Sequence, residues 1–525
     1  MQWNIGYIAK KRSILTPNKP AILYEDRPIT YKELNEGVNR FAHYLKEAGI
    51  RKGDHIAVFL RNCPEFFEIY FATAKLGIVF VSLNFRLVGP ELEYQLNHSG
   101  SRMLIFHDDL AGIVNTVRPK VRVEKFVSVK SGEHGVAERF DWAENYHEII
   151  KYFPTDEPLP DKPIDRDDPL AVIYTSGVEG VPKGAVLSHL QTYFKCFQVI
   201  LYTDMRADDL YLTQLPLFHS GGIFCAATPT LCRGATYVMR QRFDPEKFVE
   251  DIERYRATII FALTAMWRII FQTGKLDHVD LSSVRCVLGG GEKTPLSMID
   301  ELTARGLFMQ QVYGQTENSL MMVLPREDVL RKKGSIGLPG FFTEVFIGNE
   351  RGNELPPGQI GEMEARGPTV MTGYLGNPEL TAQTIVDGIL HTGDLGYRDE
   401  EGYFYIVDRA KDMYRSGGEN VYPAEVEKVL LTHPEILQVA IIGVPDDKWG
   451  ETGKAFILPK QGAKLTREEV LQFLQGKVAK FKFPTYVEFL SELPMTSSGK
   501  IKKVELKEKY GVKLSESFSP KGMGS

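Results

Sequence analysis

The chain has 525 residues, of which 43% are hydrophobic and 25% are charged. This length lies well beyond the size at which one hydrophobic core stops growing, so we expect at least two domains. The formal net charge of -5 argues against nucleic acid as a partner, because nucleic-acid binding favours a strongly basic surface. The five cysteines show no metal-ligand spacing, which indicates free thiols in a reducing cytoplasm.

In the first part of the chain, short β-rich runs alternate with helical patterns. The runs typical of strands are 55–60, 103–107, 170–176, 257–263 and 284–290, and the helical patterns cover 66–77 and 244–257. This alternation predicts an α/β fold with largely parallel strands. The most apolar early stretch, 64–83, contains Glu65, Glu68 and Lys75, so we expect a helix and a buried strand there and no integral membrane segment.

The pattern changes after about residue 340. Short strands separated by Gly/Pro turns predict a β-rich subdomain that completes a large N-terminal domain of layered α/β subdomains. Helix, strand, strand and helix patterns follow at 424–436, 439–446, 453–459 and 466–479, and they predict a small α+β C-terminal domain. We therefore expect an N-terminal domain at 1–408, a hinge at 409–413 and a C-terminal domain at 414–525.

The segment YTSGVEGVPKGAVLSH, residues 174–189, has the pattern of a phosphate-binding loop. An apolar strand leads into Ser176, Gly177, Gly180 and Lys183, and a helix is expected to begin near Ser188. Glycines let backbone N–H groups approach phosphate oxygens, and a lysine adds a positive charge. It is not a Walker A loop, because Lys183 is followed by glycine and not by serine or threonine.

Five further motifs accompany this loop in the same order and spacing as in one known superfamily. They are LPLFHSGG (215–222), VYGQTE (312–317), HTGDLGY (391–397), YRSGGENVYPAEVE (414–427) and PMTSSGKIKK (494–503). Together they resemble the adenylate-forming superfamily, which includes acyl- and aryl-CoA synthetases, luciferases and peptide-synthetase adenylation domains. The similarity covers nearly the whole chain.

The resemblance implies an ATP-dependent reaction in which a carboxylate forms an acyl-adenylate and a thiol, usually that of coenzyme A, then displaces AMP. By resemblance, Thr175, Ser176, Gly177, Gly180 and Lys183 belong to the loop that holds the β- and γ-phosphates. Glu317 would bind Mg²⁺ and Thr316 would donate a hydrogen bond to the α-phosphate. Without the other motifs, YGQTE would be interpreted as a plain turn.

The remaining nucleotide contacts are also implied by the resemblance. Asp394 would accept hydrogen bonds from both ribose hydroxyls, and Arg409 would contact the ribose or a phosphate. Tyr313 would stack on adenine beside Gly289, Gly290 and Gly291, which would flank the adenine and acyl pocket. Without the other motifs, Asp394 would be interpreted as a turn residue, Arg409 as a surface residue and Tyr313 as half-buried core. The three glycines would be interpreted as a turn at the end of a strand.

The C-terminal region resembles the part of the superfamily that serves both half-reactions. Lys500 corresponds to the lysine that reaches the α-phosphate and the attacking carboxylate, and Lys411 corresponds to the hinge position. Gly417 and Gly418 would line the pantetheine tunnel. Lys480 and Lys482 would contact the phosphates of coenzyme A, although lysines in such a pattern are ordinarily exposed to solvent.

The acid is expected to be a medium- or long-chain fatty acid or an aryl carboxylate. Relatives specific for acetate have a tryptophan where this chain has Gly314, so a glycine there is expected to leave room for a larger acyl group. His219 resembles the histidine beside the reacting carboxylate, although a core histidine is nearly as common. The expected lining of the acyl pocket is mostly apolar and includes Phe218, Gly222, Cys225, Ala226, Gly289, Gly290 and Met321.

Three alternatives stay open beside a CoA ligase. Val178 replaces the Thr or Ser that most relatives carry, which supports a non-catalytic nucleotide or acyl-adenylate binder. A luciferase-like oxygenase and peptide-synthetase chemistry are disfavoured, because the CoA-facing stretches are present and no carrier domain follows. A homodimer is expected only by analogy with relatives.

Overall fold

The computed structural model describes residues 4–132, 140–175, 181–291, 294–349, 352–409, 414–421, 423–494, 501 and 503–510. It divides into two compact units. The first is built from Met1–Thr175 and Lys183–Ala410, and the second from Ser176–Pro182 and Lys411–Ser525. In the described part of the chain, the strands form four sheets, of which three belong to the first unit. The described helices are too short or too polar to cross a membrane.

One sheet of the first unit is mostly parallel and contains the two strands that flank the predicted phosphate loop. Its strands, in spatial order, are β19 (Gly373–Tyr374), β9 (Lys183–Ser188), β8 (Pro169–Thr175), β4 (Val79–Ser82), β3 (His55–Phe59), β5 (Met103–His107), β6 (Lys125–Val129) and β7 (Glu144–Asn145). Pairing is parallel from β8 to β7, and it is antiparallel for β8 with β9 and for β9 with β19. The segment 176–182 therefore joins two adjacent antiparallel strands.

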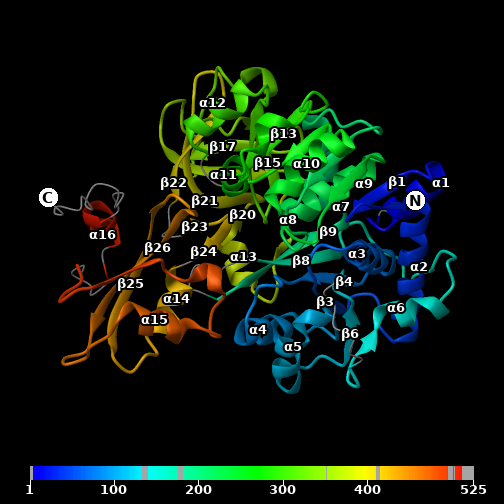
Figure 1. Ribbon diagram of the computed structural model, residues 1–525, viewed down its shortest axis with the longest axis horizontal. Coiled ribbons are helices and arrows are strands. Elements are labelled where there is room, and N and C mark those ends of the chain that lie inside the picture. Colours follow the sequence, from blue (N-terminus) through cyan, green and yellow to red (C-terminus); the bar gives the residue numbers. More distant parts are fainter. Residues whose placement is uncertain are drawn as a thin grey trace, which may run out of the picture. The chain divides into compact units, whose positions relative to one another are not determined.

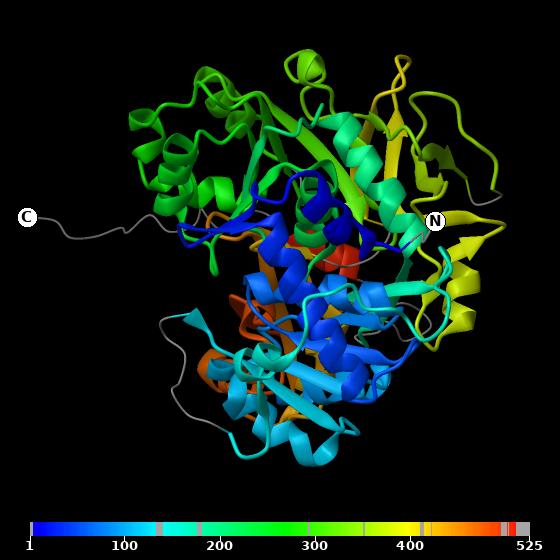
Figure 2. The same ribbon diagram turned by 90° about the vertical axis from the view of Figure 1, so that its right-hand side faces the viewer.

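Both faces of this sheet are buried, as a parallel sheet requires. Successive side chains of β3 alternate between two cores. Ile56 and Val58 pack with α2 (Tyr31–Glu47) and α3 (Pro64–Leu76), whereas Ala57 and Phe59 pack with α4 (Gly89–Ser99) and α5 (Ala111–Val117). Figure 1 shows α3 on one side of these strands and α4 and α5 on the other. In the turned view of Figure 2, the blue helices that begin the chain lie in front.

A second sheet of the first unit brings several predicted site segments to one edge. Its strands, in order, are β16 (Leu338–Pro339), β15 (Ser319–Val323), β14 (Met309–Gln315), β13 (Cys286–Gly290), β12 (Ile259–Phe261), β10 (Leu210–Thr213), β11 (Thr236–Met239), β1 (Pro20–Tyr24) and β2 (Arg27–Thr30). Strands β10, β12, β13 and β14 are parallel, so their carboxyl ends meet at one edge. The chain segments that begin at Gln214, Gly291 and Thr316 leave the sheet from this edge.

Helices cover this sheet and connect its strands. The remaining helices of the first unit are α1 (Tyr7–Leu15), α6 (Tyr146–Ile149), α7 (His189–Tyr202), α8 (Ser220–Gly222), α9 (Thr228–Arg233), α10 (Pro245–Tyr255), α11 (Thr264–Gln272), α12 (Leu296–Ala304) and α13 (Pro378–Thr384). Ser188 caps α7 through a capping box with Gln191, which confirms the predicted helix start. Between α8 and α9 the segment Ile223–Ala227 is π-helical.

The β-rich subdomain is a third, antiparallel sheet. Its strands are β17 (Glu344–Gly348), β18 (Gly361–Arg366), β21 (Ile389–Arg398), β20 (Ile385–Val386) and β22 (Phe404–Arg409), the last of which pairs with β21. The second unit contains the fourth sheet, with β24 (Glu419–Val421), β23 (Tyr414–Ser416), β26 (Gly450–Pro459), β25 (Ile436–Asp446) and β27 (Tyr486–Phe489). Its helices are α14 (Pro423–Leu430), α15 (Arg467–Leu474) and α16 (Lys503–Tyr510). The predicted α/β class, with a β-rich subdomain and a small α+β unit, is confirmed.

Candidate functional site

A lysine, a tyrosine and a glutamate meet at the end of the predicted phosphate loop. Lys183 begins β9 opposite Thr175, the last residue of β8. Its Nζ donates a hydrogen bond to Tyr374 Oη at 2.5 Å and lies 4.1 Å from the centre of the Tyr374 ring. Tyr374 Oη donates in turn to Glu317 Oε1 at 2.7 Å, and Lys183 Nζ is 3.8 Å from the same carboxylate oxygen. The tyrosine hydroxyl thus links a cation and an anion.

Backbone pairing explains why these distant residues meet. Strand β19 pairs with β9, with Tyr374 opposite Ala185. Just before β19, the backbone N–H of Met371 donates to the backbone oxygen of Glu317 at 2.6 Å. The segment 371–374 therefore spans from β9 to the turn that follows β14. Thr316, the predicted phosphate donor, lies in that same turn, between Gln315 and Glu317.

A second polar cluster surrounds Asp394, which is almost fully buried. Its Oδ2 accepts hydrogen bonds from Tyr313 Oη at 2.5 Å and from Gln315 Nε2 at 2.9 Å. Gln315 also donates to the backbone oxygen of Thr392 at 2.8 Å, so the end of β14 is joined to β21. Arg409 lies opposite Asp394 in the β21–β22 pair. The structure thus brings the two predicted ribose residues together on neighbouring strands.

The strand-end glycines lie in tightly packed surroundings. A Cβ atom on Gly290 would lie 2.3 Å from the backbone oxygen of Val312, and Gly291 has a φ of +85°. On Gly289, a Cβ atom would lie 2.2 Å from the sulfur of Met309. A side chain on Gly290 would therefore push β13 away from β14, whereas one on Gly289 would require the Met309 side chain to move.

Gly314 has a similar structural role, which differs from the one expected. A Cβ atom there would lie 1.6 Å from the backbone oxygen of Ser319, because β14 and β15 approach closely at an irregularity in their register. The glycine therefore permits this close approach of β14 and β15. We expected Gly314 to leave open space for an acyl chain. In the structure its Cβ direction points at the backbone of β15, so there is no open space on that side of the glycine.

Four of the predicted acyl-pocket residues lie on two elements that contact each other, the helical stretch 220–233 and β15, and α7 packs against both. Phe218 precedes α8, and Gly289 and Gly290 end β13. Cys225 and Ala226 lie in the π-helical segment, and Met321 lies in β15; all three are buried. His219 directly precedes α8, and its ring centroid lies 4.2 Å from that of Phe218. A π-helical turn displaces side chains from their α-helical positions and is frequent at functional sites.

Gly222 belongs to the same segment but has a packing role of its own. A Cβ atom on Gly222 would lie 2.2 Å from the backbone oxygen of Pro216. The glycine therefore lets the start of α8 fold back onto the LPLFH segment.

In the second unit, Gly417 and Gly418 form the turn between β23 and β24. Their φ angles of +58° and +84° fit a type I′ hairpin turn, which glycine adopts without strain. Lys480 is exposed at the start of a short 3₁₀ turn. The prediction for Lys482 is not supported, because its side chain is buried and donates to Glu425 Oε1 at 2.5 Å. An ion pair of this kind anchors α14 to the chain that precedes β27.

Five predicted site residues lie outside the described part of the chain. They are Ser176, Gly177, Gly180, Lys411 and Lys500. The side chain of Arg409 is likewise outside it, although its backbone is placed in β22. Their assigned roles remain predictions from the resemblance.

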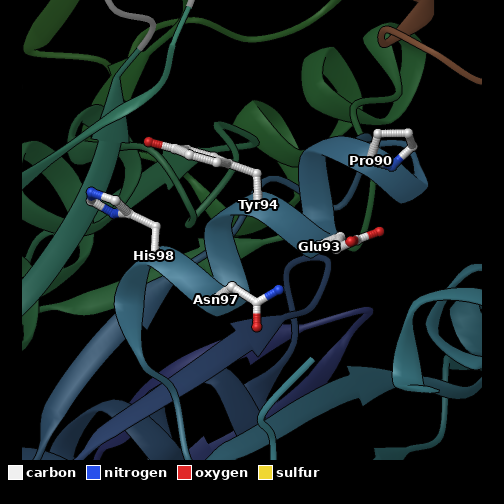
Figure 3. Close-up of a pocket in the computed structure, with 5 residues that line it drawn as sticks. All are labelled: Pro90, Glu93, Tyr94, Asn97 and His98. Carbon is white, nitrogen blue, oxygen red and sulfur yellow. The ribbon is translucent and has the colours of Figure 1, made fainter. Parts of the chain in front are cut away.

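Figure 3 shows a surface pocket on α4, whose His98 Nδ1 lies 2.8 Å from Tyr174 Oη in β8. Its lining residues, Pro90, Glu93, Tyr94, Asn97 and His98, recur at the spacing of one face of that helix. The Tyr94 and His98 rings stack at 5.3 Å. These five side chains bring no cation and carboxylate together as Lys183 and Glu317 do, so we place the candidate active site at the polar clusters.

Tyr374 and Gln315 are the site residues that sequence reasoning missed. Gln315 was part of the quoted YGQTE motif, and only its side-chain bonds to Thr392 and Asp394 reveal its role. Tyr374 lies 191 residues from Lys183 and is not in any motif singled out. The aromatic residue in the segment GYLG gave no signal of a charged partner.

Comparison with known proteins agrees with this geometry. A family described as AMP-binding enzyme matches residues 11–375, and its C-terminal domain family matches residues 425–500. Feruloyl-CoA synthase of Amycolatopsis sp is 39% identical over 97% of this chain and 99% of its own. Indoleacetate–CoA ligase of Aromatoleum aromaticum is 34% identical over 94% and 96%.

Two solved structures share the fold at near-full length. The amide bond synthetase of Marinactinospora thermotolerans has a TM-score of 0.88 and 27% identity, covering 97% of this chain and 99% of its own. A double mutant of o-succinylbenzoate CoA synthetase from Bacillus subtilis, bound with a product analogue, has a TM-score of 0.86 and 31% identity, with 95% and 98% covered. By these matches and by the motifs of its polar clusters, the chain belongs to the AMP-binding enzyme family, the adenylate-forming superfamily.

Proposed function

We propose that the protein is an ATP-dependent carboxylic acid–CoA ligase that acts on an aryl carboxylate or a medium- or long-chain fatty acid. In the first step a carboxylate oxygen attacks the α-phosphorus of ATP, the bond between that phosphorus and the bridging oxygen breaks, and pyrophosphate leaves. In the second step the sulfur of coenzyme A attacks the acyl carbon, the acyl–oxygen bond breaks, and AMP leaves. The thiol proton passes to solvent or a base.

The observation that carries the proposal is the Lys183–Tyr374–Glu317 cluster. Transfer at a phosphorus atom calls for positive charge and fixed donors near the phosphate oxygens. Lys183 supplies the charge next to the predicted loop, and the Tyr374 hydroxyl holds both Lys183 Nζ and the Glu317 carboxylate in place. Thr316 adds a hydroxyl in the same turn as Glu317.

The donor set around Glu317 suits a magnesium ion. Mg²⁺ prefers oxygen ligands and is held in proteins by one or two carboxylates together with substrate phosphates. Glu317 offers a carboxylate that lies beside a lysine suited to phosphate, so it would be the residue that holds the ion. The ion would offset the negative charge of the phosphates.

Asp394 supports the nucleoside assignment. It is a buried acceptor whose position is fixed by Tyr313 and Gln315, and a carboxylate can accept from two vicinal ribose hydroxyls. Arg409 would add a positive charge from the facing strand. In this proposal the ring of Tyr313, whose hydroxyl donates to Asp394, stacks on adenine.

The apolar surroundings of the acyl side support a large, mostly apolar acid. Phe218, Cys225, Ala226 and Met321 are buried, and each methylene removed from water contributes roughly 0.8 kcal/mol. The names of two relatives, feruloyl-CoA synthase and indoleacetate–CoA ligase, favour an aromatic acid. His219 would stand beside the reacting carboxylate.

The second step would use the C-terminal unit. In this proposal Lys500 serves adenylate formation, residues 409–413 with Lys411 serve as the hinge, and Gly417 and Gly418 leave room for pantetheine. Coenzyme A is proposed as the acceptor because two relatives similar over nearly the whole chain are named feruloyl-CoA synthase and indoleacetate–CoA ligase. All five cysteines are free thiols, which agrees with a cytoplasmic location.

The test is a thioester screen with ATP, Mg²⁺ and coenzyme A against acids from C2 to C16, benzoates, cinnamates and indoleacetate. Formation of acyl-CoA with release of AMP and pyrophosphate supports the proposal. ATP binding without pyrophosphate exchange on any acid would instead favour the nucleotide binder that Val178 suggests. Amide formation from supplied amines, with no thioester, would replace coenzyme A as the acceptor.

A further inference from the structure

Lys195 is a buried lysine on α7 whose amine lacks a hydrogen-bond partner. Lys195 is 2% exposed, and its Nζ makes no hydrogen bond within the part of the chain that the structure describes. The Phe224 ring, whose centroid is 5.6 Å from Nζ, provides only a cation–π contact. A buried ammonium group without a hydrogen bond is costly, so this side chain calls for an explanation.

The position of Lys195 in the fold points to the acyl side of the candidate site. One turn further along the same face of α7, Gln198 donates to the backbone oxygen of Leu320 in β15 at 2.6 Å. This bond turns the face that carries Lys195 toward β15, while Phe224 belongs to the π-helical segment. Lys195 thus lies among the elements that carry Cys225, Ala226 and Met321.

The charges that face Lys195 agree with this position. Burial lowers the pKa of Lys195 to about 7, against the opposing influence of Cys225, Glu317 and Cys196, which lie close enough to act on its charge. Cys225 belongs to the predicted acyl pocket, and Glu317 belongs to the phosphate cluster. Because the pKa lies near neutrality, Lys195 loses a proton more readily than an exposed lysine does, and it carries N–H bonds that can donate in either protonation state.

Lys75 shows how the same chain stabilises a buried lysine for structural purposes. Lys75 is also nearly inaccessible, but its Nζ donates to Asn35 Oδ1 at 2.7 Å, to Asn39 Oδ1 at 2.6 Å and to Glu157 Oε2 at 2.9 Å. Every N–H bond of that ammonium has an acceptor. Lys195 lacks such a set, so a purely structural role does not account for it.

We propose that Lys195 determines acid specificity by donating a hydrogen bond from Nζ to an oxygen of the acyl group other than the reacting carboxylate. The substrate class is then an oxygenated acid, either a hydroxylated aromatic acid or a hydroxylated fatty acid. The inference rests on the proposed ligase function and narrows its substrate. A pocket built to bond a substrate oxygen discriminates strongly against the analogue that lacks it, because the buried donor is then left unpaired.

The experiment compares matched acids in thioester formation by wild type and by Lys195→Met. The pairs are cinnamate with 4-hydroxycinnamate and octanoate with 8-hydroxyoctanoate. The comparison uses the pair whose carbon skeleton gives the higher kcat/KM with the wild-type protein. We expect wild type to prefer the oxygenated acid about 10–100-fold in kcat/KM. Lys195→Met should reduce this preference to within twofold, mainly by slowing the oxygenated acid.

Two further variants separate specificity from folding. Lys195→Gln keeps a neutral donor and should retain part of the preference, which covers the case in which the methionine variant does not fold. Lys75→Met removes a paired buried lysine and should lower the thermal midpoint while leaving the acid preference unchanged.

The outcomes distinguish this inference from the proposed function. Thioester formation without preference for the oxygenated acid, or an equal loss on both acids in Lys195→Met, would overturn the role of Lys195 alone; an equal loss would point to contact with the reacting carboxylate. A wild-type protein that forms no thioester with any acid of the wider screen would overturn the ligase function and this inference together.

Discussion

Replacing Tyr374 by phenylalanine removes the hydroxyl between Lys183 and Glu317 and leaves the ring in place. The lysine keeps its position 4.1 Å from the ring centre and its carboxylate neighbour at 3.8 Å, but two hydrogen bonds to charged groups are lost. One such bond contributes about 1.5–3 kcal/mol, and a tenfold change in rate corresponds to about 1.36 kcal/mol. If one bond of this strength is lost in the transition state, adenylation should slow about 10–100-fold.

The assay is ATP–pyrophosphate exchange with the best acid of the screen, because it reports adenylation without the thioester step. Tyr146→Phe is the matched control, since Tyr146 Oη donates to Glu68 at 2.6 Å, away from the proposed site. The control should lower the thermal midpoint and leave the exchange rate within twofold of wild type. An exchange rate for Tyr374→Phe that is also within twofold of wild type would refute the positioning role of Tyr374.

Three further predictions concern glycine packing, a buried ion pair and pH. Gly314→Trp should lower the thermal midpoint, because its Cβ atom would lie 1.6 Å from the backbone oxygen of Ser319 unless β14 and β15 move apart; an unchanged midpoint with a preference for shorter acids would contradict this. Lys482→Met should lower the thermal midpoint by leaving Glu425 buried without its ion pair, and a change confined to the KM for coenzyme A would argue against it. Burial raises the pKa of Glu68 to about 7, so the folded state binds this proton more tightly than the unfolded state, whose pKa is 4.5. Stability from this group is complete below pH 4.5 and is lost as pH rises toward 7; Glu68→Gln should flatten that part of the plot of thermal midpoint against pH.

Much of the fold could be predicted from the sequence because local patterns decided it. The run HIAVFL became β3 (His55–Phe59), and the pattern DPEKFVEDIERYRA became α10 with Asp244 as its cap. Ser188 and Gln191 had the spacing of a capping box, which is a local signal. The order of strands in the sheets was not predicted, because it depends on pairings between segments far apart in the chain.

Site residues that lie within sequence motifs could be predicted, whereas residues that reach the site only through tertiary contacts could not. Glu317, Lys183 and Asp394 lie within recognisable motifs, whereas Tyr374 reaches the cluster only through the pairing of β19 with β9. A lysine in a helical pattern is ordinarily solvated, so the burial of Lys195 gave no warning in the sequence.

The same limit applies to single residues whose neighbours are distant in sequence. Lys482 was interpreted as a solvated lysine available to phosphate, and its buried partner Glu425 lies 57 residues away. Gly314 was expected to leave room for the acyl group because it has no side chain. The structure shows that the backbone of Ser319 lies where the Cβ atom would be. Both differences arise because burial depends on the folded chain and not on the local motif.

The most direct test of the central claim is the stoichiometry of a single reaction. The protein is incubated with ATP, Mg²⁺, coenzyme A and the best acid, and acyl-CoA, AMP and pyrophosphate are quantified together. We predict that the three products appear in equal amounts and that none forms without the acid. Release of ADP and phosphate in place of AMP and pyrophosphate, or nucleotide binding with no turnover on any acid, would contradict the claim that this chain is an acid–CoA ligase.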